Sequence, residues 1–385
     1  MIIFSHYVTT GACEELRDWL VKERALDVVY IAFPFGPNRD RFIRVERFRD
    51  GQHVESRRSW FRLKLPEPFA YAKDFLYAMC YAIRFGRRAD VLVAGDNLLA
   101  AAGVATRWTT RIKNVVYYMI DYTPVRYANR FLNACYYCLD RFAATRADAV
   151  WPLTPQIIQG RFQAGRLDAR AVHWSTVPYG SHPLQPPATY DRKHVVYLGD
   201  VVKNKGAELF VPMVKELKKS VPDFRFTVIG GGRDVQALRD EVKAAGLETQ
   251  VEVCGFVADI NEALKRLAGA GVAIAPYYPF DANNFTFYSD PGKIKVYLGC
   301  GLPIVLTDVP PVAKDLERER AGKIAEYDAA GFANAITEVL NGDDYPEIRE
   351  NARRLGEQYA WSKVFEAAFA RLGEDGRASF VGGKV

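Results

Sequence analysis

The chain has 385 residues, of which 49% are apolar and 25% charged, and it carries a formal net charge of +6. This length is long for a single hydrophobic core and predicts two globular domains. No run reaches the roughly 18 uninterrupted apolar residues of a membrane-spanning helix, and the start MIIFSHYVTTG lacks the features of a signal peptide, so we expect a cytoplasmic protein.

The positive charge is concentrated in the first half. Residues 1–180 hold 26 Lys/Arg and 17 Asp/Glu (+9), whereas residues 181–385 hold 26 and 29 (−3). Nine Lys/Arg lie within 39–64, interleaved with Phe42, Phe48, Trp60 and Phe61. Such a segment can face an anionic membrane, a phosphorylated substrate or nucleic acid, or can be a solvated surface. Because no nucleic-acid-binding module is recognisable, no nucleic-acid partner is predicted.

The six cysteines do not form a metal-binding pattern. Cys135 and Cys138 make a lone CxxC in a stretch with helical character, without a second pair or a histidine cluster. We therefore expect reduced, mostly buried thiols and no metal.

Short apolar runs alternate with helical stretches along both halves of the chain. The runs of the first half lie at 2–6, 27–33, 89–96, 113–121 and 147–153. A proline-rich stretch, 177–194, then precedes a second series at 195–200, 224–232, 251–257, 271–278 and 303–308. Alternation of this kind predicts parallel sheets covered on both faces. We expect an α/β protein of two Rossmann-like, doubly wound domains that face each other across a cleft.

Three segments are predicted from this alternation. They are an N-terminal Rossmann-like domain (1–180), a C-terminal Rossmann-like domain (181–345), and a C-terminal helical segment with a mobile tail (346–385). The amphipathic stretch 345–372 is expected to pack back toward the N-terminal domain.

Several strand ends of the second half carry residues suited to an anion. Gly199 follows a strand, and Lys205 precedes a helix, where it can neutralise a phosphate. The segment YSDPGKIKVYLGCGLPIV (288–305) predicts a helix that begins at a Pro-Gly corner, with Lys293 and Lys295 in its first turns. An ordinary solvated helix start is the alternative, but the cluster favours a diphosphate, with both lysines facing it.

A glycine turn and an aromatic residue complete this cluster. Gly230 lies in VIGGGRD at a strand end, and Phe256 follows the next strand, where a nucleobase could stack. A dinucleotide fingerprint would need glycine at Val235, so a nicotinamide-dependent dehydrogenase is disfavoured. A turn with a core phenylalanine is the simpler alternative for Phe256.

The order YLGDVVKNKG, FTVIGGG, VEVCGFVADI, VAIAPY and SDPGKIKVYLGCGLPIV resembles the nucleotide-sugar-binding domain of GT-B fold glycosyltransferases of the family-4 type (glycosyl transferases group 1). The resemblance spans roughly 193–340, and the first half is a looser match. The resemblance implies that the domain 181–345 binds the nucleotide-sugar and that the domain 1–180 lies on the acceptor side. It implies transfer of a sugar from a nucleotide-diphosphate donor to a glycan, polysaccharide or lipid-linked acceptor. It further implies retention of anomeric configuration, no bound metal and no cofactor beyond the donor substrate.

The resemblance also implies roles for individual residues. Gly199 and Lys205, together with the nearby Lys293, are expected at the donor diphosphate. Phe256 and Val257 lie where the family holds the nucleobase, and we expect Gly230 and Val296 beside the nucleoside.

The chain also departs from the family pattern. Asp200 stands where an arginine is usual, and a pair of glutamates would fall on Tyr288 and Val296. Val296 cannot accept hydrogen bonds from a ribose, a loss that would weaken donor binding by about 1–3 kcal/mol if nothing replaces it. We expect Asp290 to take the role of the first carboxylate.

In the first half, Asp121 ends an apolar run and is expected to contact the acceptor or the donor sugar, a turn aspartate being the alternative. His6 and Gly11, which flank the loop after the first strand, are expected on the acceptor side. Two other functions stay open: a nucleotide-sugar-binding protein without turnover, and a relative of nucleotide-sugar epimerases. The basic, aromatic-rich region 39–88 suits peripheral contact with the inner face of a membrane, a buried helix with basic ends being the alternative.

Overall fold

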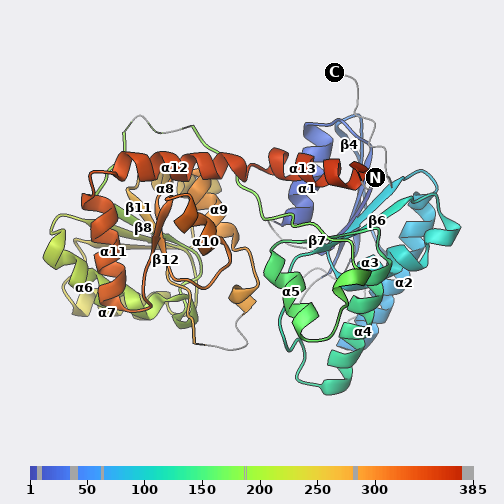
Figure 1. Cartoon of the computed structure of the whole chain (residues 1–385), viewed down its shortest axis with the longest axis horizontal. Coiled ribbons are helices and arrows are strands. Elements are labelled where there is room, and N and C mark those ends of the chain that lie inside the picture. The colour runs from blue at the N-terminus through green and yellow to red at the C-terminus, as the bar shows by residue number, and fades with distance from the viewer. Residues whose placement is uncertain are drawn as a thin grey trace. The chain divides into compact units, whose positions relative to one another are not determined.

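The computed structural model describes residues 1–6, 11–34, 42–61, 65–185, 187, 189–280 and 285–374. The chain divides into two compact units, which are coloured by residue number in Figure 1. Unit 1 comprises Met1–Pro178 with Trp361–Val385, and unit 2 comprises Tyr179–Ala360. This division differs from the predicted segments in two respects: residues 346–360 group with unit 2, and the first boundary lies after Pro178 instead of after residue 180. The tail predicted to be mobile, from residue 375 onward, lies outside the described residues.

Unit 1 is built on a sheet with the strand order β4-β3-β2-β1-β5-β6-β7. Neighbours from β2 through β7 pair in parallel, as the apolar runs predict. The strands are β1 (Ile2–His6), β2 (Val28–Phe33), β3 (Arg44–Arg49), β4 (Gln52–Arg58), β5 (Val91–Ala94), β6 (Asn114–Met119) and β7 (Ala149–Pro152).

The strands β3 and β4 form an antiparallel hairpin at the edge of this sheet. The turn uses Asp50 and Gly51, both at positive φ (49° and 75°), which suits a two-residue hairpin turn. The predicted basic segment 39–64 therefore lies largely on this edge hairpin. Residues 39–41 and 62–64 of that segment lie outside the described residues.

Helices cover the unit 1 sheet: α1 (Ala12–Lys22), α2 (Glu67–Gly86), α3 (Asn97–Ala105), α4 (Arg130–Arg146), α5 (Pro155–Gln163) and α13 (Trp361–Glu374). The C-terminal helix α13 packs on the N-terminal part of the chain through aromatic rings. Trp19 of α1 stacks on Phe369 at a centroid distance of 5.8 Å, and Trp151 of β7 meets the same ring edge-on at 5.3 Å.

Unit 2 is built on an all-parallel sheet in the order β10-β9-β8-β11-β12-β13. Read in chain order this is 3-2-1-4-5-6, the order of a doubly wound Rossmann fold. The strands are β8 (His194–Leu198), β9 (Arg225–Ile229), β10 (Val251–Gly255), β11 (Val272–Ala275), β12 (Ile304–Leu306) and β13 (Gly322–Ile324). The predicted α/β class with two Rossmann-like parallel sheets is confirmed.

Each face of the unit 2 sheet has its own hydrophobic core. Helices α6 (Phe210–Ser220), α7 (Val235–Ala244) and α11 (Ala329–Asn341) cover one face. Helices α8 (Ile260–Ala268), α9 (Gly292–Gly299), α10 (Val312–Arg318) and α12 (Tyr345–Gln358) cover the other. In β8, Val195 and Tyr197 face the first core and Val196 faces the second, the period-two alternation of a strand buried on both sides.

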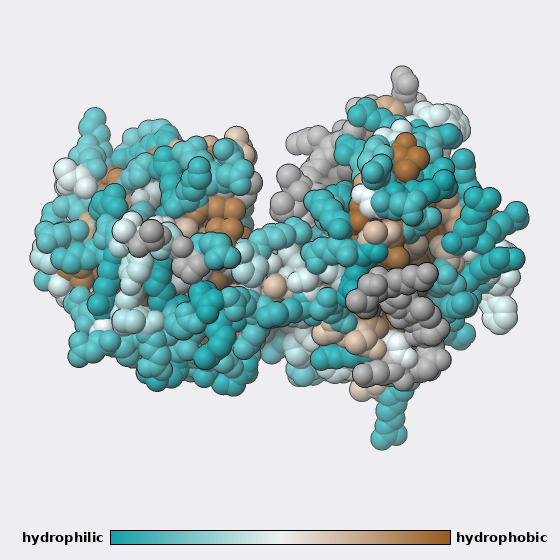
Figure 2. Space-filling view, turned by 90° about the horizontal axis from the view of Figure 1, so that it is seen from above, coloured by the Kyte–Doolittle hydropathy of each residue, from teal (hydrophilic) through white to brown (hydrophobic). Residues whose placement is uncertain are grey.

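On the face seen in Figure 2, hydrophilic residues cover most of the surface of each unit, and hydrophobic residues form small patches among the hydrophilic ones. Among the described residues, no helix has both the length and the apolar character needed to span a membrane.

Candidate functional site

The strand order of unit 2 places a topological switch point between β8 and β11, whose connections leave in opposite directions. Ligands of open α/β sheets bind outside the carboxyl ends of the strands at such a point. Gly199 and Lys205, the last residue of a short helix, follow β8, and Tyr277 lies two residues beyond β11. The helix α9 begins near the same edge, so the residues that could receive an anion gather here.

Lys293 of α9 lies between two aromatic rings at this switch point. Its Nζ is 4.5 Å from the ring centroid of Tyr197 and 4.6 Å from that of Tyr277. A Cβ atom on Gly199 would lie 3.7 Å from the same Nζ. Burial, with the nearby Lys205 charge adding to it, lowers the pKa of Lys293 to about 7, while Asp200 acts in the opposite direction. An anion beside this ammonium would stabilise its charged form.

Lys205 already has a carboxylate partner, since its Nζ donates to Asp200 Oδ2 at 2.6 Å. Both side chains are substantially exposed (38% and 67%), and such pairs contribute only about 0–1 kcal/mol. An incoming phosphate could therefore exchange with Asp200. The loop itself is fixed: Gly206 has φ +85°, and a Cβ there would lie 2.4 Å from the Pro276 carbonyl oxygen.

The glycine turn after β9 lies directly against this loop. A Cβ on Gly230 (φ +150°) would lie only 1.9 Å from the carbonyl oxygen of Gly199, so no larger residue fits without movement. The Gly230 amide donates to the Gly255 carbonyl at 2.9 Å. Phe256 follows, with its side chain 81% exposed beside Gly231. The carboxyl edge thus brings together Gly199, Gly230, Phe256, Lys205 and Lys293, and can bind an anion next to a flat ring.

Val257 and Val296 are partly buried and pack against the same hydrophobic core. The apolar side chain of Val296 offers no hydrogen-bonding group to a ribose, as expected from the sequence. Their assignment to a nucleoside stays a prediction.

Asp290 and Lys295 form a separate, buried ion pair. Asp290 Oδ1 is 3.3 Å from Lys295 Nζ, with side-chain exposures of 3% and 1%. The Tyr179 amide donates to Asp290 Oδ2 at 2.8 Å, and the Lys295 ammonium lies 3.1 Å from the Tyr359 ring centroid. Lys295 therefore does not face the anion site, contrary to the expectation that both lysines would do so. The catalytic role of Asp290 stays a prediction, and its buried partners favour a positioning role.

Two of the predicted acceptor-side residues lie at the carboxyl edge of the unit 1 sheet. His6 ends β1, and its imidazole pairs with Asp96, the N-cap of α3, which follows β5. β1 and β5 are the strands of the switch point in unit 1. Burial acts to lower the pKa of His6, but the pairing with Asp96, with smaller contributions from Asp74 and the Phe33 backbone, outweighs burial and raises that pKa. Gly11 is the N-cap of α1, and residues 7–10 between the two lie outside the described residues.

Asp121 follows β6 at the same edge of unit 1. Its carboxylate is half exposed (50%) and accepts a hydrogen bond from Arg126 Nη1 at 2.6 Å. The N-cap of α4 is Asn129, so Asp121 does not cap that helix. An exposed carboxylate at a strand end suits a role in contacting a sugar hydroxyl.

The burial of the cysteines differs from the expectation that most of the thiols would be buried. Cys13 and Cys300 are buried, but Cys80, Cys135 and Cys138 are exposed, because they lie on the outer faces of α2 and α4. In the part of the chain that the structure describes, no group of three or more His, Cys, Asp or Glu side chains could hold a metal ion.

Sequence reasoning missed the aromatic partners of Lys293. Tyr197 lies two residues before Gly199 in a strand and Tyr277 two residues beyond another strand, so alternation predicts burial and nothing predicts contact with an ammonium. Asp96 was also missed, although an aspartate directly before a helical run is a recognisable N-cap signal.

Comparisons with known proteins show which family and which fold the chain resembles. The family model of glycosyl transferases group 1 matches residues 192–342, close to the span of the predicted resemblance. A 2-deoxystreptamine N-acetyl-D-glucosaminyltransferase of Niallia circulans is 36% identical over 66 residues, which is 17% of each chain. The putative colanic acid biosynthesis glycosyltransferase WcaL of Escherichia coli is 22% identical over 331 residues, 83% of this chain and 79% of that protein.

The fold is shared with solved structures. The Anabaena protein Alr3699/HepE, crystallised with UDP, superposes with a TM-score of 0.64 at 17% identity, covering 97% of this chain and 99% of that one. The predicted resemblance and the predicted GT-B fold are thus confirmed: the chain has the GT-B fold of two Rossmann-like units, and its segment 192–342 matches the family model of glycosyl transferases group 1.

Proposed function

We propose that the protein is a glycosyltransferase that moves a sugar from a nucleoside-diphosphate donor to a hydroxyl group of a glycan, polysaccharide or lipid-linked acceptor. The observation that carries this proposal is the pair Lys205 and Lys293 at the switch point of unit 2, beside glycine turns and an exposed aromatic ring. The family match, the names of the glycosyltransferase relatives and the UDP bound to the Anabaena protein support it.

In this mechanism the bond between the anomeric carbon and the diphosphate oxygen breaks while the acceptor oxygen bonds to the same face of that carbon. Because the new bond forms on the face from which the diphosphate leaves, the anomeric configuration is retained. The leaving diphosphate takes the acceptor proton, so no strong general base is needed. Lys205 and Lys293 would stabilise the negative charge that develops on the diphosphate. A carboxylate such as Asp121 would align a sugar hydroxyl by hydrogen bonding.

The first experiment is a thermal-shift screen of the protein with UDP-, GDP- and ADP-sugars, followed by transfer assays with the donor that binds. We expect stabilisation by one nucleotide class, and a product whose anomeric configuration, read by NMR, matches the donor. Transfer measured with and without EDTA tests the predicted independence from metal. Stabilisation by none of the nucleotides would contradict the proposal, and binding without transfer or donor hydrolysis would favour the non-catalytic alternative.

We also propose that unit 1 contacts the inner face of a membrane peripherally, as the composition of the region 39–88 predicts. Phe69 and Leu76 on α2 are 66% and 61% exposed, and Trp108 is 94% exposed. The amide of Arg111, three residues after Trp108, donates to the carbonyl of Gly86 at the end of α2. Exposed arginines lie at the C-terminal end of α2 and directly after it, at positions 84, 87 and 88. Apolar side chains beside cations suit an anionic lipid surface.

Flotation with vesicles that contain anionic lipid tests this contact. We expect binding that weakens in the Trp108→Ala variant and disappears with neutral vesicles. Equal recovery with anionic and neutral vesicles, or no binding at all, would contradict it.

A further inference from the structure

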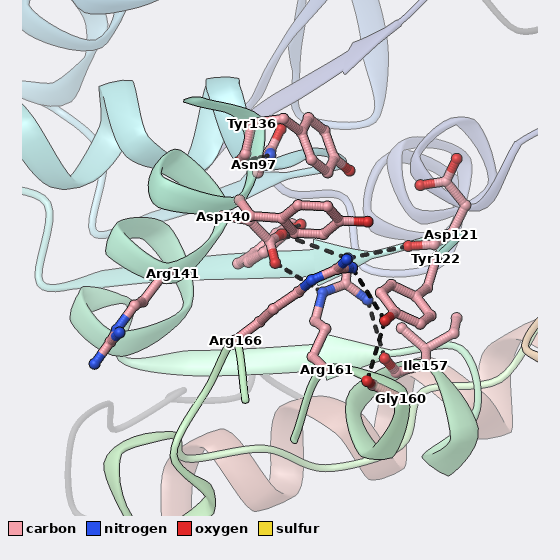
Figure 3. Close-up of polar contacts among 12 residues, drawn as sticks. Asn97, Asp121, Tyr122, Tyr136, Asp140, Arg141, Ile157, Gly160, Arg161 and Arg166 are labelled. Carbon is pink, nitrogen blue, oxygen red and sulfur yellow. Dashed lines mark hydrogen bonds and ion pairs between the residues drawn. The ribbon is translucent and has the colours of Figure 1, made fainter. Parts of the chain in front are cut away.

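The loop that follows β6, residues 121–124 (the Asp121 loop), is anchored through its main chain by side chains from elsewhere in unit 1. Figure 3 shows the side chains of Arg161 and Arg166 converging beside Asp121 and Tyr122. Arg161 Nη2 donates to the carbonyl oxygen of Asp121 at 3.2 Å, and Arg166 Nη2 donates to that of Pro124 at 2.6 Å. The Tyr137 hydroxyl donates to the carbonyl oxygen of Thr123 at 2.5 Å.

Tyr122, the remaining residue of the loop, is held by its side chain. The Tyr122 hydroxyl donates to the Gly160 carbonyl at 3.1 Å and accepts from Arg166 Nη1 at 3.1 Å. The guanidinium of Arg161 lies 4.7 Å from the centroid of the Tyr122 ring. All four residues of the loop therefore have an anchor outside it.

Arg161 is completely buried, and its partner Asp140 is 1% exposed. Arg161 Nε donates to Asp140 Oδ2 at 2.8 Å, and the Tyr117 hydroxyl donates to Asp140 Oδ1 at 2.7 Å. Burying such a pair costs desolvation that apolar residues of similar size would avoid, so stability alone does not account for it. What the pair adds is a fixed N–H group directed at the Asp121 carbonyl.

Arg166 is held by its planar shape as well as its charge. Its guanidinium lies 3.4 Å from the centroid of the Tyr137 ring while its two terminal nitrogens reach Tyr122 and Pro124. A lysine could not stack on the ring and donate in two fixed directions at once.

The carboxylate of Asp121 contrasts with this restrained main chain, because half of its surface is open to solvent. Its neighbour Arg126 is itself placed by Asn133, whose Oδ1 accepts from the amides of Arg126 and Tyr127 at 3.0 and 3.2 Å. A carboxylate that aligns a substrate has to be exposed and has to be held by a rigid loop, and Asp121 meets both conditions.

We propose that Arg161 and Arg166 are positioning residues for Asp121: together they hold the main chain of the Asp121 loop so that its carboxylate meets the sugar hydroxyl in one orientation. This proposal rests on the proposed glycosyltransferase function. Neither arginine touches the reacting atoms, and both act through the loop.

The test compares Arg166→Ala with Arg141→Ala, a matched control. Arg141 is an exposed residue of α4 whose side chain points away from the cluster in Figure 3. Amide hydrogen exchange of residues 121–127 and steady-state kinetics are measured on both variants and on the unaltered protein. We expect faster exchange in this segment and a kcat lower by about 10–100-fold for Arg166→Ala, with an unchanged donor KM. Added methylguanidine should restore part of the kcat of this variant, and Arg141→Ala should behave as the unaltered protein.

Arg161→Lys provides a second variant that keeps the buried positive charge. It should also show faster amide exchange in residues 121–127 and a lower kcat. Unchanged exchange in Arg166→Ala would overturn the proposal, as would faster exchange with an unchanged kcat. If the unaltered protein transfers no sugar, the proposed function fails, and amide exchange alone then decides whether the arginines hold the loop.

Discussion

The ammonium of Lys205 donates a hydrogen bond to the carboxylate of Asp200 at 2.6 Å, so the candidate diphosphate site holds an anion of its own. A nucleoside diphosphate would have to displace this carboxylate. Removing its charge should therefore favour the ligand: we expect Asp200→Asn to bind UDP about 2–5-fold more tightly, in keeping with the small energy of an exposed pair. Isothermal titration at two salt concentrations checks this. Weaker binding by the variant would show that Asp200 assists the ligand instead of competing with it.

Donor affinity should depend on pH through Lys293, whose pKa is lowered to about 7 by burial and by Lys205. The ammonium is charged below that pH and loses its proton above it, so UDP binding should weaken as pH rises above 7. The Lys293→Met variant should bind more weakly, with a flatter pH profile. In the protein without UDP, the stability of the fold depends on pH in the opposite direction. Because the unfolded lysine keeps its proton up to about pH 10.5, Lys293 makes stability rise with pH above 7, and Lys293→Met should lose that rise. A UDP affinity of the unaltered protein that is constant from pH 6 to 9 would contradict this assignment.

The ion pair of Asp290 and Lys295 should matter for stability as a unit. Removing either partner leaves the other charge buried, so Asp290→Asn and Lys295→Met should each destabilise the fold by about 3–5 kcal/mol. The double variant should lose much less than the sum of the two. Chemical denaturation of the three variants measures this coupling. Additive losses would show that the two side chains act independently.

Asp121→Asn should lower the transfer rate while leaving UDP affinity unchanged, because Asp121 belongs to unit 1 and the two lysines belong to unit 2. An amide can still accept a hydrogen bond but carries no charge, so we expect a loss of about 10–100-fold in kcat. Asp90→Asn, at an exposed aspartate of the same unit, is the matched control. A kcat that is equal for both variants would exclude Asp121 from the reaction.

The residues at the carboxyl edge of unit 2 could be predicted from the sequence because the patterns that indicate them are local. A strand followed by glycine, a lysine before a helix and a Pro-Gly corner each act within a few residues, and Gly199, Lys205 and Lys293 do lie at one edge. The directions of side chains were harder to predict. Lys293 and Lys295 are two residues apart on a helix, about 200° around its axis, and so face different partners. That spacing alone argues against a shared anion.

Contacts between distant segments could not be predicted from the sequence. Asp290 accepts from the amide of Tyr179, 111 residues earlier, and Arg161 reaches the carbonyl of Asp121, 40 residues earlier. No local pattern encodes either contact. The β3–β4 hairpin was missed for a different reason: its many arginines suggested a charged surface, although Asp50-Gly51 is a strong hairpin-turn signal.

The most direct test of the account is the affinity of UDP for four proteins: the unaltered chain, Lys205→Ala, Lys293→Ala and Lys203→Ala. Lys203 is an exposed lysine two residues from Lys205 and serves as the control. A lost charge-assisted hydrogen bond costs about 1.5–3 kcal/mol, so the first two variants should bind at least about tenfold more weakly. Lys203→Ala should bind as the unaltered protein does. Equal affinities in all four proteins, or no binding of UDP, GDP or ADP by the unaltered chain, would contradict the claim that this edge of unit 2 holds a nucleoside diphosphate.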